Sequence, residues 1–424
     1  MKKVSYLLVT LLAYLPLQYI QATTELKGIK PVVVSFSEKA PNDLRLLIKS
    51  ALDQHPRMQA SRAVMQVSLK QLKAAQQAVY NPELELDTER ADVNSSYLQI
   101  SQTIDMGDQR GSLTNVAQAE LVKAKADFEL AVLQLQNDLV STYIEHDTQS
   151  ELSKLSGDAL KLMREFTKIA ELRYKTGDLS QVELDLARLA HSEAVLDHAN
   201  VLSEAISARE KLNAIFISLP TTLPALRSKL PQAKLPNDIE AFLRTLPKVR
   251  SREAMINIAR STVKLRRSER RINPTVALRG GRDGSESIVG LSLSIPLNVR
   301  NNYSAEIEVA QQQLIESEQL GHQAFRDQRA KVLASTQRLQ LLRKAWLIWK
   351  KTGQSSVSRQ LESIKRLWRA GDMSTSDYLV QLKQTLDTQV AGIELRNKLW
   401  NSTLEWLLVT ASIDDWLNLT TEIN

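Results

Sequence analysis

Apolar residues recur along much of this chain at intervals of three and four, the spacing of helices that pack along a coiled-coil seam. The clearest series runs through Leu121, Ala124, Phe128, Ala131, Leu135, Leu139 and Thr142. The second half of the chain repeats the pattern in Val332, Thr336, Leu339, Leu342, Trp346 and Trp349, and then in Leu379, Leu382, Leu386, Val390 and Ile393. The chain is therefore predicted to be mainly helical.

Proline spacing indicates that these helices are long. No proline lies between Pro82 and Pro220, and none follows Pro296. One proline inside a helix costs about 3 kcal/mol, so both stretches favour uninterrupted helices. A helix over residues 108–175 would be about 100 Å long, far more than a globular domain of this size needs. Two glycines are the expected points of interruption or bending: Gly157 and Gly353.

One turn sequence occurs twice. Arg173-Tyr-Lys-Thr-Gly-Asp-Leu-Ser180 has a counterpart in Leu367-Trp-Arg-Ala-Gly-Asp-Met-Ser374. In each, a glycine supplies the left-handed backbone that ends one helix. A capping box then opens the next helix, Ser180-x-x-Glu183 in the first copy and Ser374-x-x-Asp377 in the second. Each stretch is predicted to be the tip of a helical hairpin.

The repetition extends over most of the chain. His55-Pro56 and Leu246-Pro247 lie 191 positions apart, Asn81-Pro82 and Asn273-Pro274 lie 192 apart, and Gly177 and Gly371 lie 194 apart. Ordered landmarks at a nearly constant offset indicate an internal duplication. We therefore expect a first repeat at 41–216, a proline-rich irregular connector at 217–246, a second repeat at 247–411 and a C-terminal tail at 412–424.

Each repeat also contains one predicted β-hairpin, at 82–104 and at 274–296, the second with a turn at Gly280–Gly284. Apolar and polar residues alternate in both, as in Leu84 and Leu86 between Glu83, Glu85 and Asp87. Such strands suit a transmembrane barrel, although a soluble hairpin packed on the helices has the same pattern. Four strands are too few to close a barrel, so the membrane interpretation requires several copies of the chain.

The N-terminus has the pattern of a secretory signal peptide. Lys2 and Lys3 precede an apolar run from Val4 to Leu17, and Ala22 is a suitable cleavage residue. Cleavage after residue 22 would remove both lysines and no acid, lowering the formal charge from +7 to +5. An uncleaved anchor is the alternative, but the apolar run is short for a membrane-spanning helix.

Composition excludes several kinds of chemistry. The chain has no cysteine, so disulfides, thiolate catalysis, thiolate metal sites and a lipid-modified N-terminal cysteine are ruled out. Basic and acidic residues alternate without a basic stripe of interleaved aromatics, so no nucleic-acid partner is expected. The sequence contains no Gly-x-Ser-x-Gly motif or phosphate-binding loop. His191 and His198 lie seven apart on one helical face but are interpreted as structural, and we predict no catalytic, cofactor or metal site.

Three motifs carry a family resemblance: Tyr-Asn-Pro-Glu-Leu84, Ile-Ser-Gln-Thr-Ile-Asp-Met-Gly-Asp-Gln-Arg-Gly111 and Arg-Tyr-Lys-Thr-Gly177. With the duplicated hairpins, they make residues 41–411 resemble the TolC-type outer-membrane efflux channels, most closely the heavy-metal (CzcC-like) branch. The resemblance implies a homotrimer with a helical barrel continuous with a 12-stranded outer-membrane β-barrel, four strands coming from each chain. The connector would form an equatorial collar.

The resemblance also implies a function without enzyme activity. The chain would be a passive exit duct in the outer membrane of a Gram-negative bacterium, with most of its mass in the periplasm. Its partners would be a periplasmic adaptor (membrane fusion) protein, an inner-membrane pump of the resistance-nodulation-division type and outer-membrane lipid. The expected cargo is heavy-metal cations. The alternatives are a multidrug or other small-molecule channel, and a periplasmic helical adaptor or scaffold.

In this interpretation the two sides of the strands have different roles. The expected lipid-facing residues are Leu84, Leu86, Leu98, Ile100, Val276, Leu278, Val289, Leu291 and Leu293. The expected pore-facing residues are Glu83, Glu85, Asp87, Gln99, Thr275, Arg279 and Ser292.

The hairpin tips supply the remaining site residues. The adaptor-docking surface is predicted to comprise Tyr174, Gly177, Asp178, Trp368, Gly371 and Asp372. Related channels carry a ring of acidic side chains just inside the tip, and alignment from Gly371 gives Asp377 this position, with Glu183 as its repeat counterpart. Both residues also close the predicted capping boxes, a sufficient role without a pore. Val380 stands where related channels have a second carboxylate, a departure from the pattern.

Overall fold

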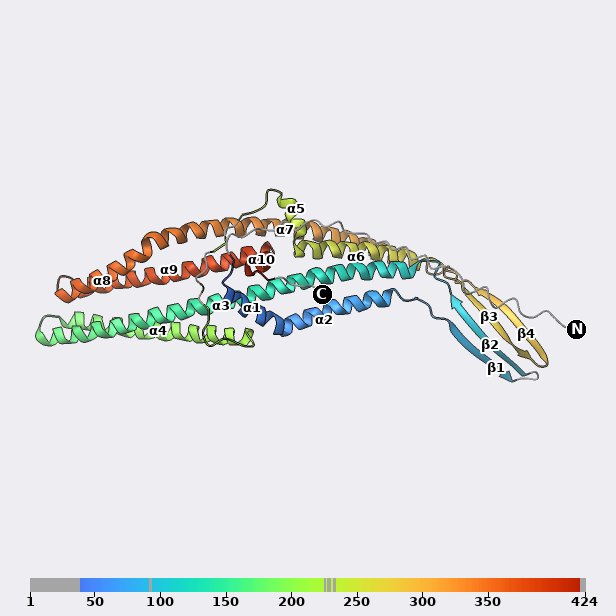
Figure 1. The fold of residues 1–424 in the computed structure, drawn as a ribbon, viewed down its shortest axis with the longest axis horizontal. Helices are drawn as coiled ribbons and strands as arrows, with labels where there is room; N and C mark the ends of the chain where they lie inside the picture. The colour runs from blue at the N-terminus through green and yellow to red at the C-terminus, as the bar shows by residue number, and fades with distance from the viewer. Residues whose placement is uncertain (1–38, 91–93, 225, 227–229, 232–233, 420–424) are drawn as a thin grey trace.

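The structure is a computed structural model that describes residues 39–90, 94–224, 226, 230–231 and 234–419 (Figure 1). The expected signal peptide and the last five residues of the expected tail lie outside these ranges. The helices of the first repeat are α1 (Asn42–Gln54), α2 (Pro56–Ala75), α3 (Gln109–Thr176) and α4 (Gln181–Ile215). The later ones are α5 (Ile239–Thr245), α6 (Pro247–Glu269), α7 (Ser304–Ile348), α8 (Gln354–Ala370), α9 (Thr375–Val409) and α10 (Ile413–Leu417), with a π-helical turn, η1 (Trp349–Gly353).

The molecule is elongated, with a sheet at one end and two helical tips at the other (Figure 1). The strands are β1 (Glu83–Arg90), β2 (Asn94–Thr103), β3 (Thr275–Asp283) and β4 (Glu286–Ser294). On the sheet side of the middle, α2, α3, α6 and α7 pack in that order as one layer. On the tip side, α3 packs against α4 and α9, and α9 packs against α8. The predicted fold, mainly helical with a small antiparallel sheet, is confirmed.

The two repeats match in the kind, order and length of their elements. Helices α4 and α9 both have 35 residues. Helix α3 has 68 residues, which corresponds to about 100 Å. Its counterpart runs from Ser304 to Ala370 but is interrupted by η1.

The glycines behave differently in the two long helices. Gly157 does not interrupt α3, and a Cβ there would make only an ordinary contact, 3.4 Å from the His198 ring of α4. In the second repeat, Gly353 ends η1 as expected. A Cβ at Gly353 or at Gly392 of α9 would come within 2.2 and 2.3 Å of the Trp349 indole. The π turn and the two glycines therefore accommodate one large side chain between helices.

The main hydrophobic core lies midway along the molecule, where α1, α3, α9 and α10 meet. Trp406 and Trp416 are fully buried, and Trp406 Nε1 donates to Thr336 Oγ1 over 3.0 Å. Residues 412–417, expected as a tail, instead include α10 with Trp416 in this core. The expected irregular connector likewise contains α5, whose first turn is capped by Asp238 and whose Phe242 and Leu243 are buried in the same core. Among the described helices, none is both long and apolar enough to cross a membrane.

Candidate functional site

The four strands form one antiparallel sheet in the order β1-β2-β3-β4. Register places Leu84, Ile100, Leu278 and Leu291 in one row across all four strands. The neighbouring rows hold the other expected lipid-facing residues, and every one of the nine lies on the same face. Eight of them are more than half exposed, from 52% at Leu98 to 80% at Val289. The sheet therefore presents a continuous apolar surface that no described element of this chain covers.

The opposite face of the sheet is mainly polar. One row contains Glu85, Gln99 and Arg279, and Gln99 Nε2 donates to Glu85 over 3.1 Å. The Arg279 guanidinium lies 4.7 Å from the centre of the Tyr97 ring. The expected pore-facing residues all share this face, together with Ala277 and Ile288. Their orientation toward a pore remains a prediction.

The prediction of a turn at Gly280–Gly284 was wrong. Strand β3 continues to Asp283, which pairs with Glu286, so Gly284 and Ser285 make the turn. A Cβ at Gly281 would lie 2.1 Å from the Ser96 carbonyl oxygen and 2.8 Å from the Tyr97 ring. Gly281 thus serves the close approach of β2 to β3 rather than a turn.

A small network of hydrogen bonds joins the two repeats where the helices meet the sheet. The Gly107 N–H donates to Asn273 Oδ1 over 3.0 Å, and Asn273 Nδ2 donates to the Tyr80 hydroxyl over 3.2 Å. A Cβ at Gly107 would lie 2.6 Å from the Ser268 carbonyl oxygen. Nearby, the Asp105 carboxylate accepts from the first N–H groups of α3, at 2.8 and 2.9 Å. These contacts give the Asn-Pro and Asp-Met-Gly motifs a structural role.

At the other end of the molecule, both hairpin tips have the predicted glycine geometry. Gly177 and Gly371 have φ values of 85° and 87°. The N–H of the following aspartate closes each helix end, from Asp178 to Arg173 O over 2.9 Å and from Asp372 to Leu367 O over 3.0 Å. Tyr174 is 41% exposed. Both tips are thus compact, rigid turns.

Trp368 was predicted to lie on the docking surface, but it is buried, with 2% exposure. Its ring centre lies 4.5 Å from that of Phe166 and 5.1 Å from that of Tyr378. Burial raises the pKa of the Tyr378 hydroxyl to about 12. The aromatic cluster therefore fastens the tip of the second repeat to α3 of the first. In the sequence, the sign of this cluster was the presence of three large aromatic residues, Phe166, Trp368 and Tyr378, near the predicted tips.

Arg173 reinforces this connection and was not singled out by the sequence. Its Nη2 donates to the carbonyl oxygens of Trp368 and Arg369, over 3.2 and 3.1 Å, and its guanidinium lies 5.1 Å from the centre of the Trp368 ring. Terminal carbonyls of a helix need donors, and a cation is favourable at that end of the helix dipole. Arg173 thus caps α8 from the other repeat.

The two expected constriction carboxylates lie at the starts of α4 and α9. Glu183 completes a full capping box, accepting from the Ser180 N–H over 3.0 Å. The hydrogen bonds from the Ser180 backbone and hydroxyl lower the pKa of Glu183. The second predicted box is only half formed: the Asp377 N–H donates to Ser374 Oγ, but the Asp377 carboxylate contacts that hydroxyl and not the Ser374 N–H. Aspartate is one methylene shorter than glutamate, and Asp377 is exposed.

A groove of about 600 Å³ lies between α3, α4 and α9, next to the tips. Its walls are mainly apolar and include Leu155, Leu189 and Leu379. Lys383 Nζ lies 2.9 Å from Glu193 at this groove, and the hydrogen bond and charge of Glu193 raise the pKa of Lys383. Both side chains are exposed, so the pair contributes little to stability.

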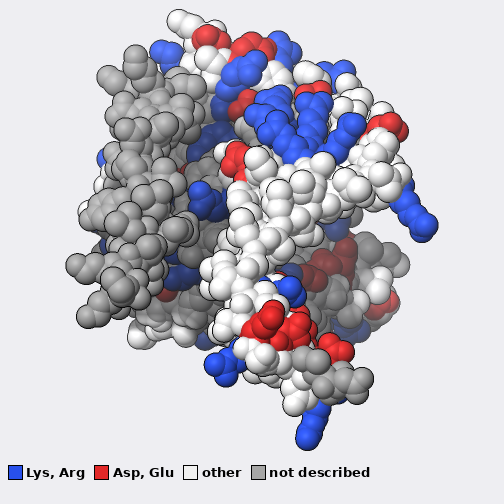
Figure 2. All heavy atoms as spheres, turned by 90° about the vertical axis from the view of Figure 1, so that its right-hand side faces the viewer, with Lys and Arg blue, Asp and Glu red and all other residues white. Residues whose placement is uncertain are grey.

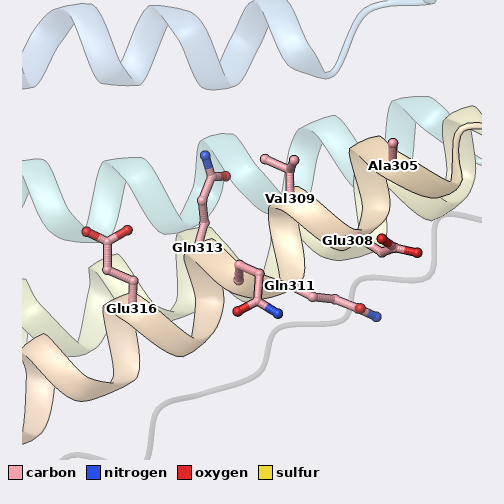
Figure 3. Close-up of a pocket in the computed structure, with 7 residues that line it drawn as sticks. Ala305, Glu308, Val309, Gln311, Gln313 and Glu316 are labelled. Atoms are coloured by element: carbon pink, nitrogen blue, oxygen red, sulfur yellow. The ribbon is translucent and has the colours of Figure 1, made fainter.

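Two other features lack the geometry of a site. Figure 3 shows a hollow on α7 whose lining side chains diverge from a single helix, Val309 and Gln313 on one side and Gln311 on the other. His198 Nδ1 lies 2.9 Å from Ser156 Oγ, in a contact between helices. Within the described ranges, no three His, Asp or Glu side chains are grouped as metal ligands.

Comparison with known proteins shows which family and which relatives this chain resembles. Residues 47–216 match the family model "Outer membrane efflux protein". The cobalt-zinc-cadmium resistance protein CzcC of Cupriavidus metallidurans is 23% identical over 237 residues, which are 53% of this chain and 57% of CzcC. The match thus spans little more than half of that relative.

Solved structures match over nearly the whole chain. The CmeC outer membrane channel of Campylobacter jejuni has a TM-score of 0.75 at 14% identity, covering 90% of this chain and 91% of CmeC. CusC, described in its structure as forming a transmembrane channel, has a TM-score of 0.74 at 14% identity, covering 88% and 92%. Residues 47–216 thus resemble the outer membrane efflux protein family, and the chain as a whole has the fold of outer-membrane channels.

Proposed function

We propose that this chain is the passive outer-membrane duct of an efflux system and acts as a homotrimer. The observation that carries the proposal is the sheet, which has one face with nine apolar residues, eight of them more than half exposed, one mainly polar face, and two edges, β1 and β4, that no described strand pairs. A closed barrel is the way in which strands satisfy their backbone groups in lipid. Three copies would supply twelve strands, with the apolar face toward lipid and the carboxylates of β1 toward the pore.

The helical end would receive cargo from the periplasm. The compact tips and the adjacent apolar groove suit a helical partner, and we assign this role to a periplasmic adaptor that links the duct to an inner-membrane pump of the resistance-nodulation-division type. Energy would come from the pump, and this chain would act as a passive conduit. Asp377, exposed at the start of α9, is the stronger candidate for a cation-binding constriction; Glu183 is engaged in its capping box.

The proposed cargo is heavy-metal cations, which rests on the likeness to CzcC, a cobalt-zinc-cadmium resistance protein. A deletion strain should become more sensitive to cobalt, zinc or cadmium and regain resistance when the chain is restored. Copper, silver and several organic drugs serve as comparisons. Increased sensitivity to organic drugs alone would contradict the metal assignment and favour a multidrug channel.

A separate experiment tests the duct itself. The purified protein should migrate as a heat-sensitive trimer from the outer-membrane fraction and conduct ions in planar bilayers. A freely soluble monomer without conductance would contradict the proposal and favour a periplasmic scaffold.

A further inference from the structure

The apolar surface of the sheet does not end where the strands end. Strand β4 stops at Ser294, yet the series of alternate apolar residues continues through Ile295, Leu297 and Val299, which are 49%, 72% and 83% exposed. Beyond β2, Ile104 and Met106 resume the series of Leu98 and Ile100 after Gln102 and are 46% and 65% exposed. The junction between sheet and helices therefore carries an exposed apolar surface of its own.

Length shows why this extension matters. From Val289 to Leu293 the apolar series of β4 covers only about 14 Å at the rise of an extended strand. Continued to Val299 at the same rise, it covers about 34 Å, or about 26 Å of depth at the usual barrel tilt of about 40°. The apolar band of outer-membrane barrels is about 25 Å tall. The apolar series within β4 is too short for that band, and the apolar residues of the junction extend it to the required height.

Basic side chains lie where the apolar extension ends. Arg267 is exposed in the last turn of helix α6. Arg270 and Arg271, which follow the end of the helix, are also exposed. None of the three forms an ion pair with any residue in the described ranges, whereas Arg266 is paired with Glu269 at 2.7 Å. Figure 2, which views the molecule from the sheet end, shows Lys and Arg side chains gathered beside the base of the sheet.

The contacts of the junction hold these arginines beside the apolar extension. Asn298 Nδ2 donates to the Arg270 carbonyl oxygen over 3.0 Å, so the segment with Leu297 and Val299 runs next to them. A Cβ at Gly107 would lie 3.4 Å from Arg271 Cβ. Cations do favour a helix C-terminus, but that effect is confined to the last turn and requires no adjacent apolar surface.

We propose that the arginine collar, defined as Arg267, Arg270 and Arg271, binds the phosphate groups of anionic phospholipids while Ile295, Leu297 and Val299 contact their acyl chains. The proposal rests on the proposed function, because it takes the sheet to span the outer membrane. Guanidinium groups bind phosphate through paired hydrogen bonds. Each basic residue at an anionic surface changes lipid affinity by about fivefold, so loss of the three corresponds to on the order of a hundredfold.

Lipid binding is tested with the full-length protein in nonionic detergent, titrated with phosphatidylglycerol or phosphatidylcholine and followed by native mass spectrometry. Wild type should prefer phosphatidylglycerol, and the triple Arg→Gln variant of the collar should lose that preference. The matched control changes Arg164, Arg359 and Arg366, exposed arginines without ion pairs in the described structure at the other end, to Gln and should behave as wild type. Equal lipid preference in the collar variant would overturn the proposal.

Two further arms identify the ligand. Millimolar inorganic phosphate should not displace phosphatidylglycerol; ready displacement would show that a free phosphate is bound and would overturn the lipid assignment. Since the chain has no cysteine, Leu297→Cys is a unique reporter of depth. A water-soluble maleimide should label it quickly in the unfolded protein but much more slowly in phosphatidylcholine vesicles containing one part in about three of phosphatidylglycerol. Equally fast labelling in the vesicles would place the junction outside the bilayer and contradict the proposal.

Conductance separates this proposal from the function on which it rests. Normal conductance without a preference for phosphatidylglycerol would overturn only the arginine collar. Failure of the wild type to insert and conduct in phosphatidylcholine vesicles, with or without phosphatidylglycerol, would overturn the proposed duct as well.

Discussion

The carboxylate of Glu183 illustrates how a single hydrogen-bonded acid makes the tip sensitive to pH. Ser180 donates to the charged form and lowers the pKa of Glu183 below its ordinary value of 4.5. The resulting stabilisation is present above pH 4.5, the value in the unfolded chain, and is lost as pH falls through the lower folded value. Protection of the start of α4 against hydrogen exchange, corrected for intrinsic rates, should therefore decrease below about pH 4.5.

The matching substitution removes that dependence. Glu183→Gln should reduce protection of α4 at pH 7 and make it nearly independent of pH between about 3 and 6, since the ionising group is gone. Asp185→Asn, in an exposed position of the same helix, serves as the control. An unchanged pH profile in Glu183→Gln would contradict this role of the capping box.

Asp377 offers a test of the proposed constriction at the same scale. Asp377→Asn keeps the N–H donated to Ser374 and deletes the charge, so the start of α9 should remain intact. Single-channel recordings in planar bilayers should show lower cation selectivity and weaker block by multivalent cations. Asp372→Asn, at the exposed turn, should have a smaller effect. Unchanged selectivity in Asp377→Asn would leave Asp377 as a helix cap.

Leu291 and Ser292 are neighbours that lie on opposite faces of β4. Leu291→Glu should strongly reduce outer-membrane assembly, because a charged side chain on the lipid face of a barrel is destabilising near the bilayer centre. Ser292→Glu should be tolerated, since its face is polar. Trimer recovered from the outer membrane measures both effects. Equal tolerance at the two positions would argue against the assigned faces.

At the scale of elements, the aromatic cluster of Phe166, Trp368 and Tyr378 couples the two hairpins. Trp368→Ala removes a fully packed indole, for which a loss of about 3–5 kcal/mol is typical. Hydrogen exchange should accelerate at the ends of both α3 and α8. Leu367→Ala, in the same turn but 43% exposed, should change exchange little. Faster hydrogen exchange in α8 alone would show that the aromatic cluster does not couple the two tips.

The tip glycines have a second consequence for these elements. An added Cβ at Gly177 or Gly371 meets no atom within 4 Å, so the cost of substitution comes from the positive φ angle and not from crowding. Gly177→Val with Gly371→Val should abolish efflux while trimers still assemble, because the strain stays local to the turns. The corresponding asparagine variants, which tolerate this backbone, should retain efflux. Normal export by the valine variant would count against docking at the tips.

At the scale of the whole molecule, the features that could be predicted from the sequence are those that depend on the spacing of residues close together in the chain. Periodicity and proline spacing indicated the long helix α3, and alternation placed all nine residues that are expected to face lipid on one face of the sheet. The burial of Trp368 was missed, because its partner Phe166 lies in the other repeat and local spacing does not bring the two together. Gly281 was mistaken for a turn residue because its neighbours Ser96 and Tyr97 come from a distant strand. The half-formed box at Asp377 depends on the reach of a single methylene.

The open edges of the sheet have a consequence for inheritance. Strands β1 and β4 each have one side without a partner among the described strands, so a barrel of three copies would need every copy to supply two sound edges. A mutation that blocks one edge would then disable intact copies in the same assembly. With equal amounts of mutant and normal chains, roughly one trimer in eight would be free of defect. Edge mutations should therefore be genetically dominant, whereas lesions in the tip of a single copy leave the barrel able to close.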